Sequence, residues 1–528
     1  MRLFAAPTPD VEPGQSVSAM IARHAAERPD DLALVCDDLR LGWRDFEARV
    51  NQVANALNAM GIGPGDKVSM LARNSAAYVE IFIGTIRAGA CIVPLSTMAA
   101  ADALERMVVD SGSKALFLSD DMRSLAAPFA DRLGGLVPGG RIALDFATEG
   151  WQDYPAWRDA AASRNPGHVI GIDDHFNLIY SSGTTGVPKG IMHSNGVRTQ
   201  LCKVTEAFGY GPGGVTILST PLYSNTTIVA LLPTLAWGGA VVVMRKFDAA
   251  AYLALVEREK CSHTMLVPVQ YKRIMDLDNF ADFDLSSMQV KLSTSAPLRA
   301  ALKRDIVARF PGLMVEIYGA TEQGGSTMLN CNEFPDKLAS VGQPGLGADI
   351  RVIDEDGVEL PQGGIGEIVG RSPNMMEGYF GRNDLTEELL WHDPEDNVFF
   401  RSGDTGYFDE DGFLFLSDRL KDMIISGGLN IYANDLELVL LDHPAVDDAA
   451  VIAVPSEQWG ETPLGIVVPK NATDVAPEEI CDWANQRLGK GQRLSAVIFQ
   501  DELPRSSIGK ILKRELREPY WRETGGET

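Results

Sequence analysis

Apolar runs alternate with amphipathic helices through the first half of the chain, and no other feature of the sequence restricts the fold as much. The run LALVCD at 32–37 has strand character, and 44–60 carries apolar residues at helical spacing. GIGPGDK ends that helix, VSMLA begins a strand, and AYVEIFIGTIRAGA with CIVPLS repeats the unit. The alternation predicts mostly parallel sheets covered by helices. The apolar positions of the first helix are Phe46, Val50, Val53, Leu57 and Met60.

The second half is richer in short strands and turns. Segments 349–372 and 405–419 each predict strands joined by an Asp-Gly turn. After Arg419, strand-like runs and a helix from about Pro477 to Leu488 predict a small α+β unit. We therefore expect an N-terminal domain over 1–417, a boundary segment at 418–421 and a C-terminal domain over 422–528.

The charge balance restricts the class of partner. The 528 residues include 47 Lys and Arg against 72 Asp and Glu, a formal net charge of −25. Such an excess of carboxylates repels a phosphate backbone, which argues against a nucleic-acid partner. An anionic small molecule would have to be held by local positive groups. Hydrophobic residues make up 45% of the chain, which excludes a disordered protein.

No segment of the sequence predicts a membrane span. The N-terminus has no apolar stretch of signal-peptide length, and the longest apolar run, 229–244, is too short to cross a bilayer. That run contains Pro233 and predicts a buried helix, a turn and a strand. The six cysteines are scattered without a Cys-x-x-Cys pair, a pattern typical of free thiols in a reducing compartment. We therefore expect a cytoplasmic protein.

The segment YSSGTTGVPKG at 180–190 indicates phosphate binding. Its glycines let backbone N–H groups face an anion, its hydroxyls add donors, and Lys189 adds a positive charge. A kinase or ATPase loop needs Gly-x-x-x-x-Gly-Lys-Ser/Thr. Counted from Gly183, the second glycine falls on Pro188 and the hydroxyl residue on Gly190, so that pattern fails. The loop must serve another phosphate chemistry.

Six further motifs follow this loop in order: STSAPL (293–298), YGATE (318–322), GEIVGRSPNMMEGY (366–379), RSGDTG (401–406), SDRLKDMIISGGLNIYANDLE (417–437) and LPRSSIGKILKREL (503–516). Together they resemble the adenylate-forming superfamily, which contains acyl-CoA synthetases, nonribosomal-peptide adenylation domains and firefly luciferase. The closest resemblance in type is to the acyl-CoA synthetases. It implies an α/β fold with a large N-terminal domain of helix-covered sheets, a small β-barrel-like part and a small mobile α+β C-terminal domain.

The resemblance also implies a two-step ligation. A carboxylate is a poor electrophile, so it first attacks the α-phosphate of ATP and forms an acyl-AMP mixed anhydride with release of pyrophosphate. The thiolate of coenzyme A then displaces AMP and forms a thioester. ATP and coenzyme A are thus the expected co-substrates, and Mg²⁺ is the expected metal ion.

The matched positions imply a nucleotide site. Thr184 and Lys189 would hold the terminal phosphates of ATP, while Tyr318 would lie against adenine. Thr321 would reach a phosphate oxygen, and Glu322 with Thr184 would bind Mg²⁺, a hard cation that prefers oxygen ligands. The other residues expected around ATP or AMP are Ser181, Ser182, Gly183, Thr185, Gly186, Ser295, Ala296, Pro297, Glu316, Ile317 and Gly319.

The C-terminal motifs imply that the small domain presents different groups in the two steps. Asp404 would accept hydrogen bonds from the ribose hydroxyls, and Arg419 would assist. Lys510 would offset the negative charge that gathers when the carboxylate meets the α-phosphate. Rotation about a hinge at Lys421 would then replace Lys510 with a glycine loop along which pantetheine approaches. The glycines of that loop are Gly427 and Gly428.

The segment PLYSNTTIV at 221–229 departs from the superfamily. Many members have a gating histidine near the carboxylate, where this chain has Ser224. The change indicates either a polar feature on the acid or small side chains that only satisfy the local backbone. The small residues of ATEQGGS suit a bulky or elongated acid, whether fatty, aryl or polycyclic. The residues expected to line the acyl pocket are Tyr223, Ser224, Asn225, Thr226, Gly319, Ala320 and Gly324.

The leading interpretation is an ATP-dependent ligase that joins a fatty, aryl or other bulky hydrophobic acid to CoA. The alternative is an adenylation enzyme that loads a carrier protein supplied in trans, although no carrier-like module follows Lys510. Luciferase-like oxygenation would start from the same adenylate. The sequence leaves open the acid and whether the protein forms a homodimer. A binding protein that has lost catalysis is disfavoured, because the expected catalytic residues are all present: Lys510, Glu322, Thr184 and Lys189.

Overall fold

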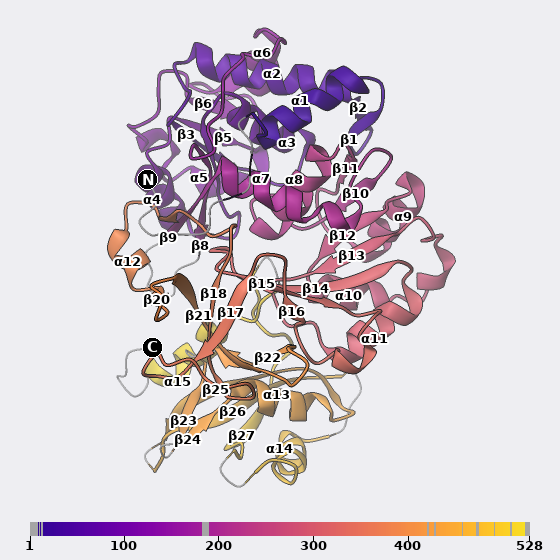
Figure 1. Ribbon diagram of the computed structural model, residues 1–528, viewed down its shortest axis with the longest axis vertical. Helices are drawn as coiled ribbons and strands as arrows, with labels where there is room; N and C mark the ends of the chain where they lie inside the picture. Colours follow the sequence, from indigo (N-terminus) through magenta and orange to yellow (C-terminus); the bar gives the residue numbers. More distant parts are fainter. Residues whose placement is uncertain are drawn as a thin grey trace. The chain divides into compact units, whose positions relative to one another are not determined.

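The computed structural model describes residues 9, 11, 14–181, 189–419, 422–426, 429–456, 458–470, 475–489, 492–506 and 509–522. The chain divides into two compact units (Figure 1). The first unit comprises Met1–Ile350 and Gly370–Phe400, and the second comprises Arg351–Val369 and Arg401–Thr528. The expected hinge at 418–421 stays a prediction, and Lys421 lies outside the described residues.

One large sheet of the first unit is built around parallel strands. Its central strands β10, β12, β13 and β14 run parallel, as does β11 beside β10. Antiparallel strands close both edges, because short hairpins join β1 to β2 and β14 to β15. The order is β16 (Gln343–Pro344), β15 (Ser326–Asn330), β14 (Leu313–Gly319), β13 (Val290–Ser293), β12 (His263–Leu266), β10 (Val215–Leu218), β11 (Ala240–Val243), β1 (Leu32–Cys36) and β2 (Leu39–Gly42).

A second sheet of the same unit carries the phosphate-loop motif. Its strands β4, β3, β5, β6 and β7 are parallel, whereas β8 and β9 form an antiparallel hairpin on either side of residues 182–188. The order is β19 (Gly378–Tyr379), β9 (Lys189–Ser194), β8 (His175–Ser181), β4 (Cys91–Pro94), β3 (Lys67–Leu71), β5 (Ala115–Leu118), β6 (Arg141–Ala143) and β7 (Gln152–Asp153).

Helices cover these sheets, as the strand–helix alternation predicts. The fold class is confirmed, with the difference that the sheets are mixed because the edge strands and the phosphate-loop hairpin are antiparallel. The helices of the first unit are α1 (Val17–Glu27), α2 (Trp43–Ala59), α3 (Ala76–Arg87), α4 (Ala101–Ser111), α5 (Arg123–Ala126), α6 (Tyr154–Asp159), α7 (Asn195–Val204), α8 (Asn225–Ala236), α9 (Ala249–Glu259), α10 (Pro268–Met275), α11 (Ala300–Arg309) and α12 (Asn383–Glu387).

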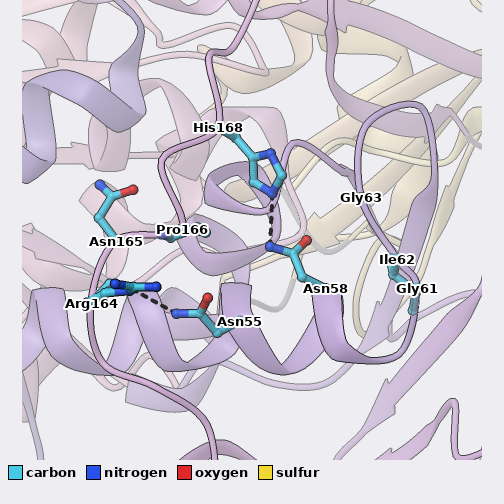
Figure 2. Close-up of a pocket in the computed structure, with 9 residues that line it drawn as sticks. All are labelled: Asn55, Asn58, Gly61, Ile62, Gly63, Arg164, Asn165, Pro166 and His168. Carbon is cyan, nitrogen blue, oxygen red and sulfur yellow. Dashed lines mark hydrogen bonds between the residues drawn. The ribbon is translucent and has the colours of Figure 1, made fainter.

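A polar groove of about 600 Å³ lies along α2 (Figure 2). Asn55 Nδ2 donates hydrogen bonds to the carbonyls of Ala162 and Arg164 at 2.7 and 2.8 Å. Asn58 Nδ2 donates to His168 Nε2 at 2.9 Å. These hydrogen bonds hold the segment 162–168 against α2. None of the expected site residues lines this groove.

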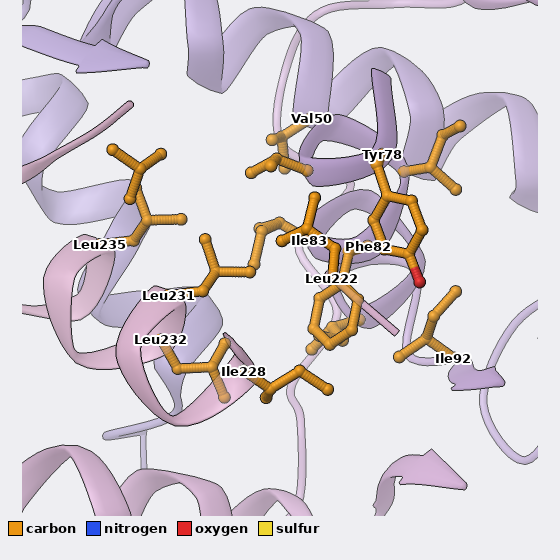
Figure 3. Close-up of a cluster of buried hydrophobic side chains, with 14 of the residues drawn as sticks. Val50, Tyr78, Phe82, Ile83, Ile92, Leu222, Ile228, Leu231, Leu232 and Leu235 are labelled. Atoms are coloured by element: carbon orange, nitrogen blue, oxygen red, sulfur yellow. The ribbon is translucent and has the colours of Figure 1, made fainter. Parts of the chain in front are cut away.

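The other face of α2 packs into the main hydrophobic core, together with α3 and α8 (Figure 3). Val50 from α2, Phe82 from α3 and Leu231 from α8 are fully buried there. A Cβ at Gly84 would lie 2.5 Å from Val53 Cγ1, so glycine permits the close approach of α2 and α3. The apolar run 229–244 forms most of α8, a turn and β11, as its sequence predicts.

The second unit contains smaller sheets. One of these sheets has the order β24 (Leu429–Ile431), β23 (Ile424–Ser426), β26 (Gly460–Pro469) and β25 (Val446–Ser456), with β27 (Ala496–Phe499) on β26. Its helices are α13 (Ala433–Leu441), α14 (Pro477–Asn485) and α15 (Lys513–Arg522). The Asp-Gly turns expected in this region separate β17 (Asp349–Ile353) from β18 (Gly366–Arg371) and β21 (Val398–Phe408) from β22 (Leu414–Arg419), and the start of β21 pairs with β20 (Leu390–His392).

Two findings bear on the expected cellular context. Within the described residues, no helix has the length and apolar character needed to cross a membrane. All six cysteines are buried and carry free thiols.

A buried ion pair joins α11 to β14 in the first unit. Lys303 pairs with Glu316, and both side chains are almost fully buried. Lys303 Nζ also donates to the carbonyls of Leu338 and Ser340 at 2.7 and 2.9 Å. Burial raises the pKa of Glu316, and the lysine charge opposes that rise. Loss of Lys303 would therefore leave the Glu316 carboxylate buried without a cation, at a large cost in stability.

Replacing Lys303 with Met should destabilise the protein by about 3–5 kcal/mol, because the substitution leaves the Glu316 carboxylate buried without a cation. The combined variant Lys303→Met with Glu316→Leu should recover most of that loss, since both charges are then gone. Urea denaturation at pH 7 measures both free energies of unfolding. A Lys303→Met protein within about 1 kcal/mol of wild type would contradict this view of the pair.

Candidate active site

Three of the sequence motifs follow neighbouring parallel strands of one sheet. PLYSNTTIV comes after β10, STSAPL overlaps the end of β13, and YGATE overlaps the end of β14. Because β10, β12, β13 and β14 are parallel, their carboxyl ends meet at one edge. Open α/β sheets bind ligands outside such an edge. The topology thus brings the expected acyl-pocket and nucleotide segments together.

Side chains at this edge contact one another. Thr226 Oγ1 and Ser295 Oγ are 2.6 Å apart, which joins the start of α8 to the STSAPL segment. Ser295 has a φ of 79°, a left-handed conformation that a non-glycine residue rarely adopts. Glu316 Oε1 accepts a hydrogen bond from Leu298 N at 3.0 Å and so anchors the far end of the segment. Glu316 therefore holds the STSAPL segment through this hydrogen bond, while its charge is paired with Lys303.

The phosphate-loop hairpin presents Lys189 at the start of β9. The described flanking residues Ser181 and Lys189 are paired across β8 and β9. Lys189 Nζ lies 5.2 Å from the centre of the Tyr379 ring, a cation–π contact. The remaining expected loop residues, Ser182, Gly183, Thr184, Thr185 and Gly186, lie outside the described residues, as does the side chain of Ser181.

Tyr379 connects the phosphate-loop strand to the YGATE motif. Its strand β19 pairs with β9, placing Tyr379 opposite Ile191. The Tyr379 hydroxyl donates a 2.9 Å hydrogen bond to Glu322 Oε1, and Met376 N donates to the Glu322 carbonyl at 3.0 Å. Burial and the neighbouring Glu322 carboxylate raise the pKa of Tyr379, so the hydroxyl remains a donor. Lys189, the Tyr379 ring and the half-buried Glu322 carboxylate thus form one continuous row.

His193 fixes the backbone of YGATE. Asn177 Nδ2 and Arg198 Nη2 lie 3.1 and 3.2 Å from His193 Nδ1, and both are donors, so Nδ1 must accept. His193 Nε2 then carries the proton and donates to the Thr321 carbonyl at 2.8 Å. Burial and the Arg198 charge hold the pKa of His193 well below its usual value. The neutral imidazole is a structural support for Thr321.

Four of the expected acyl-pocket residues, 223–226, lie at the start of α8. Ser224 caps the helix, and its Oγ accepts from Thr226 N at 3.3 Å. Tyr223 is buried, whereas Ser224 and Asn225 are half-buried. Ser224 therefore satisfies local backbone, and Asn225 is the polar residue of the segment whose amide is engaged by a distant side chain, that of Arg198.

The other expected pocket residues lie beyond β14. Gly319 is exposed at the end of the strand, followed by Ala320. A Cβ at Gly324 would lie 2.7 Å from Phe400 Cβ and 2.9 Å from the Gly370 carbonyl. Glycine at 324 is therefore required by close packing. The motif segments after β13 and β14 also contain the expected nucleotide-site residues Ile317, Tyr318, Thr321, Ala296 and Pro297.

In the second unit, Asp404 and Arg419 are cross-strand partners on β21 and β22. The side chain of Arg419 lies outside the described set. Glu367 shapes the loop before Asp404: its Oε2 accepts from Arg401 Nε at 2.8 Å, and its Oε1 accepts from Gly403 N at 3.3 Å. The register thus supports the expectation that Asp404 and Arg419 act on one ligand.

Lys510 lies in a tight turn of the same unit. Arg505 and Ile511 form an antiparallel bridge, and Gly509 N donates to the Ser506 carbonyl at 2.8 Å. Lys510 N donates to Ser506 Oγ at 3.1 Å, and its side chain is half-buried. The glycines expected to contact CoA, Gly427 and Gly428, lie outside the described residues.

Sequence reasoning gave no role to three residues that organise these segments. Tyr379 and Glu367 both lie within GEIVGRSPNMMEGY, so the motif itself was the available signal. Arg198 had no such signal, because it lies in α7 outside every recognised motif. Its importance depends on burial and on its partners, which only the tertiary structure reveals.

Comparison with known proteins agrees with this arrangement. Residues 21–380 match the AMP-binding enzyme family, and residues 435–510 match the C-terminal domain of AMP-binding enzymes. The chain is 34% identical to a feruloyl-CoA synthase from an Amycolatopsis species, over 96% of this chain and 99% of the relative.

Two further likenesses cover nearly the whole chain. The long-chain-fatty-acid–CoA ligase FadD13 of Mycobacterium tuberculosis is 31% identical over 96% of this chain and 99% of its own. The crystal structure of ATP-bound MatB from Rhodopseudomonas palustris superposes with a TM-score of 0.85 at 29% identity, covering 96% of this chain and 99% of that one. The chain therefore belongs to the AMP-binding enzyme family and, within the adenylate-forming superfamily, to the AMP-forming acid–thiol ligases of acyl-CoA synthetase type.

Proposed function

We propose that this ligase joins a bulky, largely hydrophobic carboxylic acid to CoA through an acyl-AMP intermediate, releasing pyrophosphate and then AMP. The observation that carries the proposal is the row formed by Lys189, Tyr379 and Glu322. It joins the phosphate-loop strand to YGATE beside the carboxyl ends of β13 and β14. A cation over the Tyr379 ring and a carboxylate bonded to the Tyr379 hydroxyl suit a metal-bound polyphosphate.

Glu322 is the residue that would hold Mg²⁺. Among the described residues, Tyr379 is the side chain bonded to its carboxylate, at Oε1, which leaves Oε2 for a ligand. The described residues contain no group of three or more metal-binding side chains. This fits Mg²⁺, which is commonly bound by one or two carboxylates together with substrate phosphates. When bound, the ion would neutralise charge on the departing pyrophosphate; Thr184 is the second proposed ligand.

The chain's own residues would divide the work of adenylation. Lys189 would hold the terminal phosphates, while Thr321, whose backbone is fixed by His193, would meet a phosphate oxygen. Asp404 and Arg419, paired across two strands, would hold the ribose. Lys510 would stabilise the negative charge that develops when the acid oxygen bonds to the α-phosphorus. Departure of Lys510 about a hinge at Lys421 would then admit the CoA thiolate beside Gly427 and Gly428.

The acid would enter beside the start of α8. The relatives are named for a feruloyl and a long-chain fatty acyl group, which supports a hydrophobic acid of aryl or alkyl type. A panel of such acids, assayed for pyrophosphate release with and without CoA, tests the function. We expect stoichiometric pyrophosphate, AMP and thioester when CoA is present. Adenylate formation without any thioester in the presence of CoA would favour a carrier protein as acceptor.

Tyr379→Phe should raise the Mg²⁺ concentration needed for half-maximal activity by about tenfold, because it removes the hydrogen bond that orients the Glu322 carboxylate. The measurement is pyrophosphate release against Mg²⁺ concentration at saturating ATP. Tyr154→Phe is the matched control, since Tyr154 also donates to a carboxylate, Glu80 Oε2 at 2.7 Å, in the core. If both variants shift the Mg²⁺ dependence equally, Tyr379 has no special relation to a metal site.

Lys510→Ala should slow adenylate formation by about 10²-fold or more, through loss of a charge-stabilising donor. Thioester formation from chemically supplied acyl-AMP and CoA should stay close to the wild-type rate, because Lys510 has then left the site. The two half-reactions are measured separately with the same enzyme preparation. Equal slowing of both would contradict the division of labour.

Lys421→Pro should have the opposite effect, because proline restricts φ at the proposed hinge. Adenylate should accumulate while thioester production fails. The comparison uses pyrophosphate release and thioester yield from preformed adenylate. A Lys421→Pro enzyme that makes thioester at the wild-type rate would show that rotation at this residue is not needed.

A further inference from the structure

Arg198 is a fully buried cation whose hydrogen-bond partners are all neutral. Its Nε donates to Asn177 Oδ1 at 2.7 Å, and its Nη2 contacts His193 Nδ1 at 3.2 Å and Asn225 Oδ1 at 2.9 Å. Among the described residues, no carboxylate is paired with it, and no group accepts a hydrogen bond from its Nη1. The side chain has no measurable exposure.

A charge in this environment is costly to keep. Burial lowers the pKa of Arg198 to about 9, which leaves the guanidinium charged at pH 7. Buried cations are normally paired with an anion, because desolvation is otherwise uncompensated. Holding Asn177 and His193 needs hydrogen-bond donors but no net charge. Among the described residues, no anion compensates this charge and no acceptor takes the Nη1 donors.

Arg198 also fixes the orientation of the Asn225 amide. Guanidinium nitrogens are donors only, so Asn225 must turn its Oδ1 toward Arg198 and its Nδ2 away from it. Asn225 is half-buried at the first position of α8, directly after Ser224, and no described residue bonds to its Nδ2. The positive end of the α8 dipole lies at the same place. Amide donors, helix dipole and guanidinium charge all favour an oxygen acceptor beside Asn225.

We propose that Asn225, positioned by Arg198, selects acids that carry a second oxygen acceptor in addition to the reacting carboxylate. This inference rests on the proposed ligase function and adds a chemical requirement to its substrate. Asn225 would donate from Nδ2 to an ether, carbonyl, hydroxyl or carboxylate oxygen on the body of the acid. Arg198 would act through Asn225, by holding the amide orientation and by placing positive charge behind it.

Isosteric acids test the requirement directly. In octanoate, one chain CH2 at a time is replaced by an ether oxygen, and 4-ethylcinnamate is compared with 4-methoxycinnamate. An ether oxygen accepts a hydrogen bond and cannot donate one, and without a donor its desolvation makes it the poorer ligand. We expect at least one ether acid to exceed its parent about tenfold in kcat/KM for CoA-thioester formation, the value of one well-placed hydrogen bond.

Asn225→Asp gives the sharpest variant. Aspartate can keep the bond to Arg198, where it would also neutralise the buried cation, but it presents an oxygen in place of the amide donors. The preference for the ether acid should invert, while the KM for ATP stays unchanged and the melting temperature does not fall. Arg198→Met should bring the ratio close to 1 by releasing Asn225. Lys203→Met, which removes a cation elsewhere on α7, should leave the ratio as in the wild type.

The outcomes separate the inference from the function on which it rests. If no acid yields AMP or thioester with wild-type enzyme, the ligase function fails and the inference with it. If thioesters form but every ether acid is used no better than its parent, the polar selection is overturned and the ligase function stands. Equal loss for all acids in Asn225→Asp would assign Asn225 to the reacting carboxylate, which also overturns the selection.

Discussion

Burial of α8 on nearly every side fixes the position of the polar groups at its N-terminus. The helix packs with α2 and α3 in the hydrophobic core of the first unit, as in Figure 3. Packing therefore holds the helix in place, and its first residues lie beyond the carboxyl end of β10. Thr226 then meets Ser295, and Asn225 meets Arg198. An interior made of aliphatic side chains thus determines the position of the polar groups.

The protein handles its buried charges in contrasting ways. The Glu316 carboxylate is neutralised by Lys303 and fixes the STSAPL segment through a backbone hydrogen bond. Arg198 contacts side chains of β8, β9 and α8, but all of these hydrogen-bond partners are neutral. The first charge is compensated within the protein, whereas the second has no anionic partner among the described residues.

Much of this arrangement follows from local sequence patterns. Helical periodicity located α2 within a residue at each end, and the apolar run 229–244 gave α8 and β11. The motifs located Lys189 and Glu322, because backbone and side-chain chemistry at a phosphate must recur at fixed spacing. The antiparallel edges escaped prediction, since strand direction depends on connections that apolar alternation does not encode.

The contacts that tie distant segments together had no local signature. Tyr379 and Glu322 are 57 positions apart, and the hydrogen bond between them depends on β19 pairing with β9. Gly324 is an expected pocket residue, and the structure adds a packing requirement that the sequence does not show, because a Cβ there would meet Gly370 and Phe400. Arg198 lies outside every motif, so nothing in the sequence distinguishes it from any other arginine in a helix. Packing, which is cooperative over the whole domain, decides such roles.

In the proposed reaction, the acid is activated by bonding its own oxygen to the α-phosphorus of ATP. An acid labelled with ¹⁸O in its carboxylate tests this most directly, with mass spectrometry of the nucleotide after turnover with CoA. The account predicts that each turnover transfers one labelled oxygen to AMP and none to pyrophosphate. Unlabelled AMP, or label in inorganic phosphate or pyrophosphate, would contradict it.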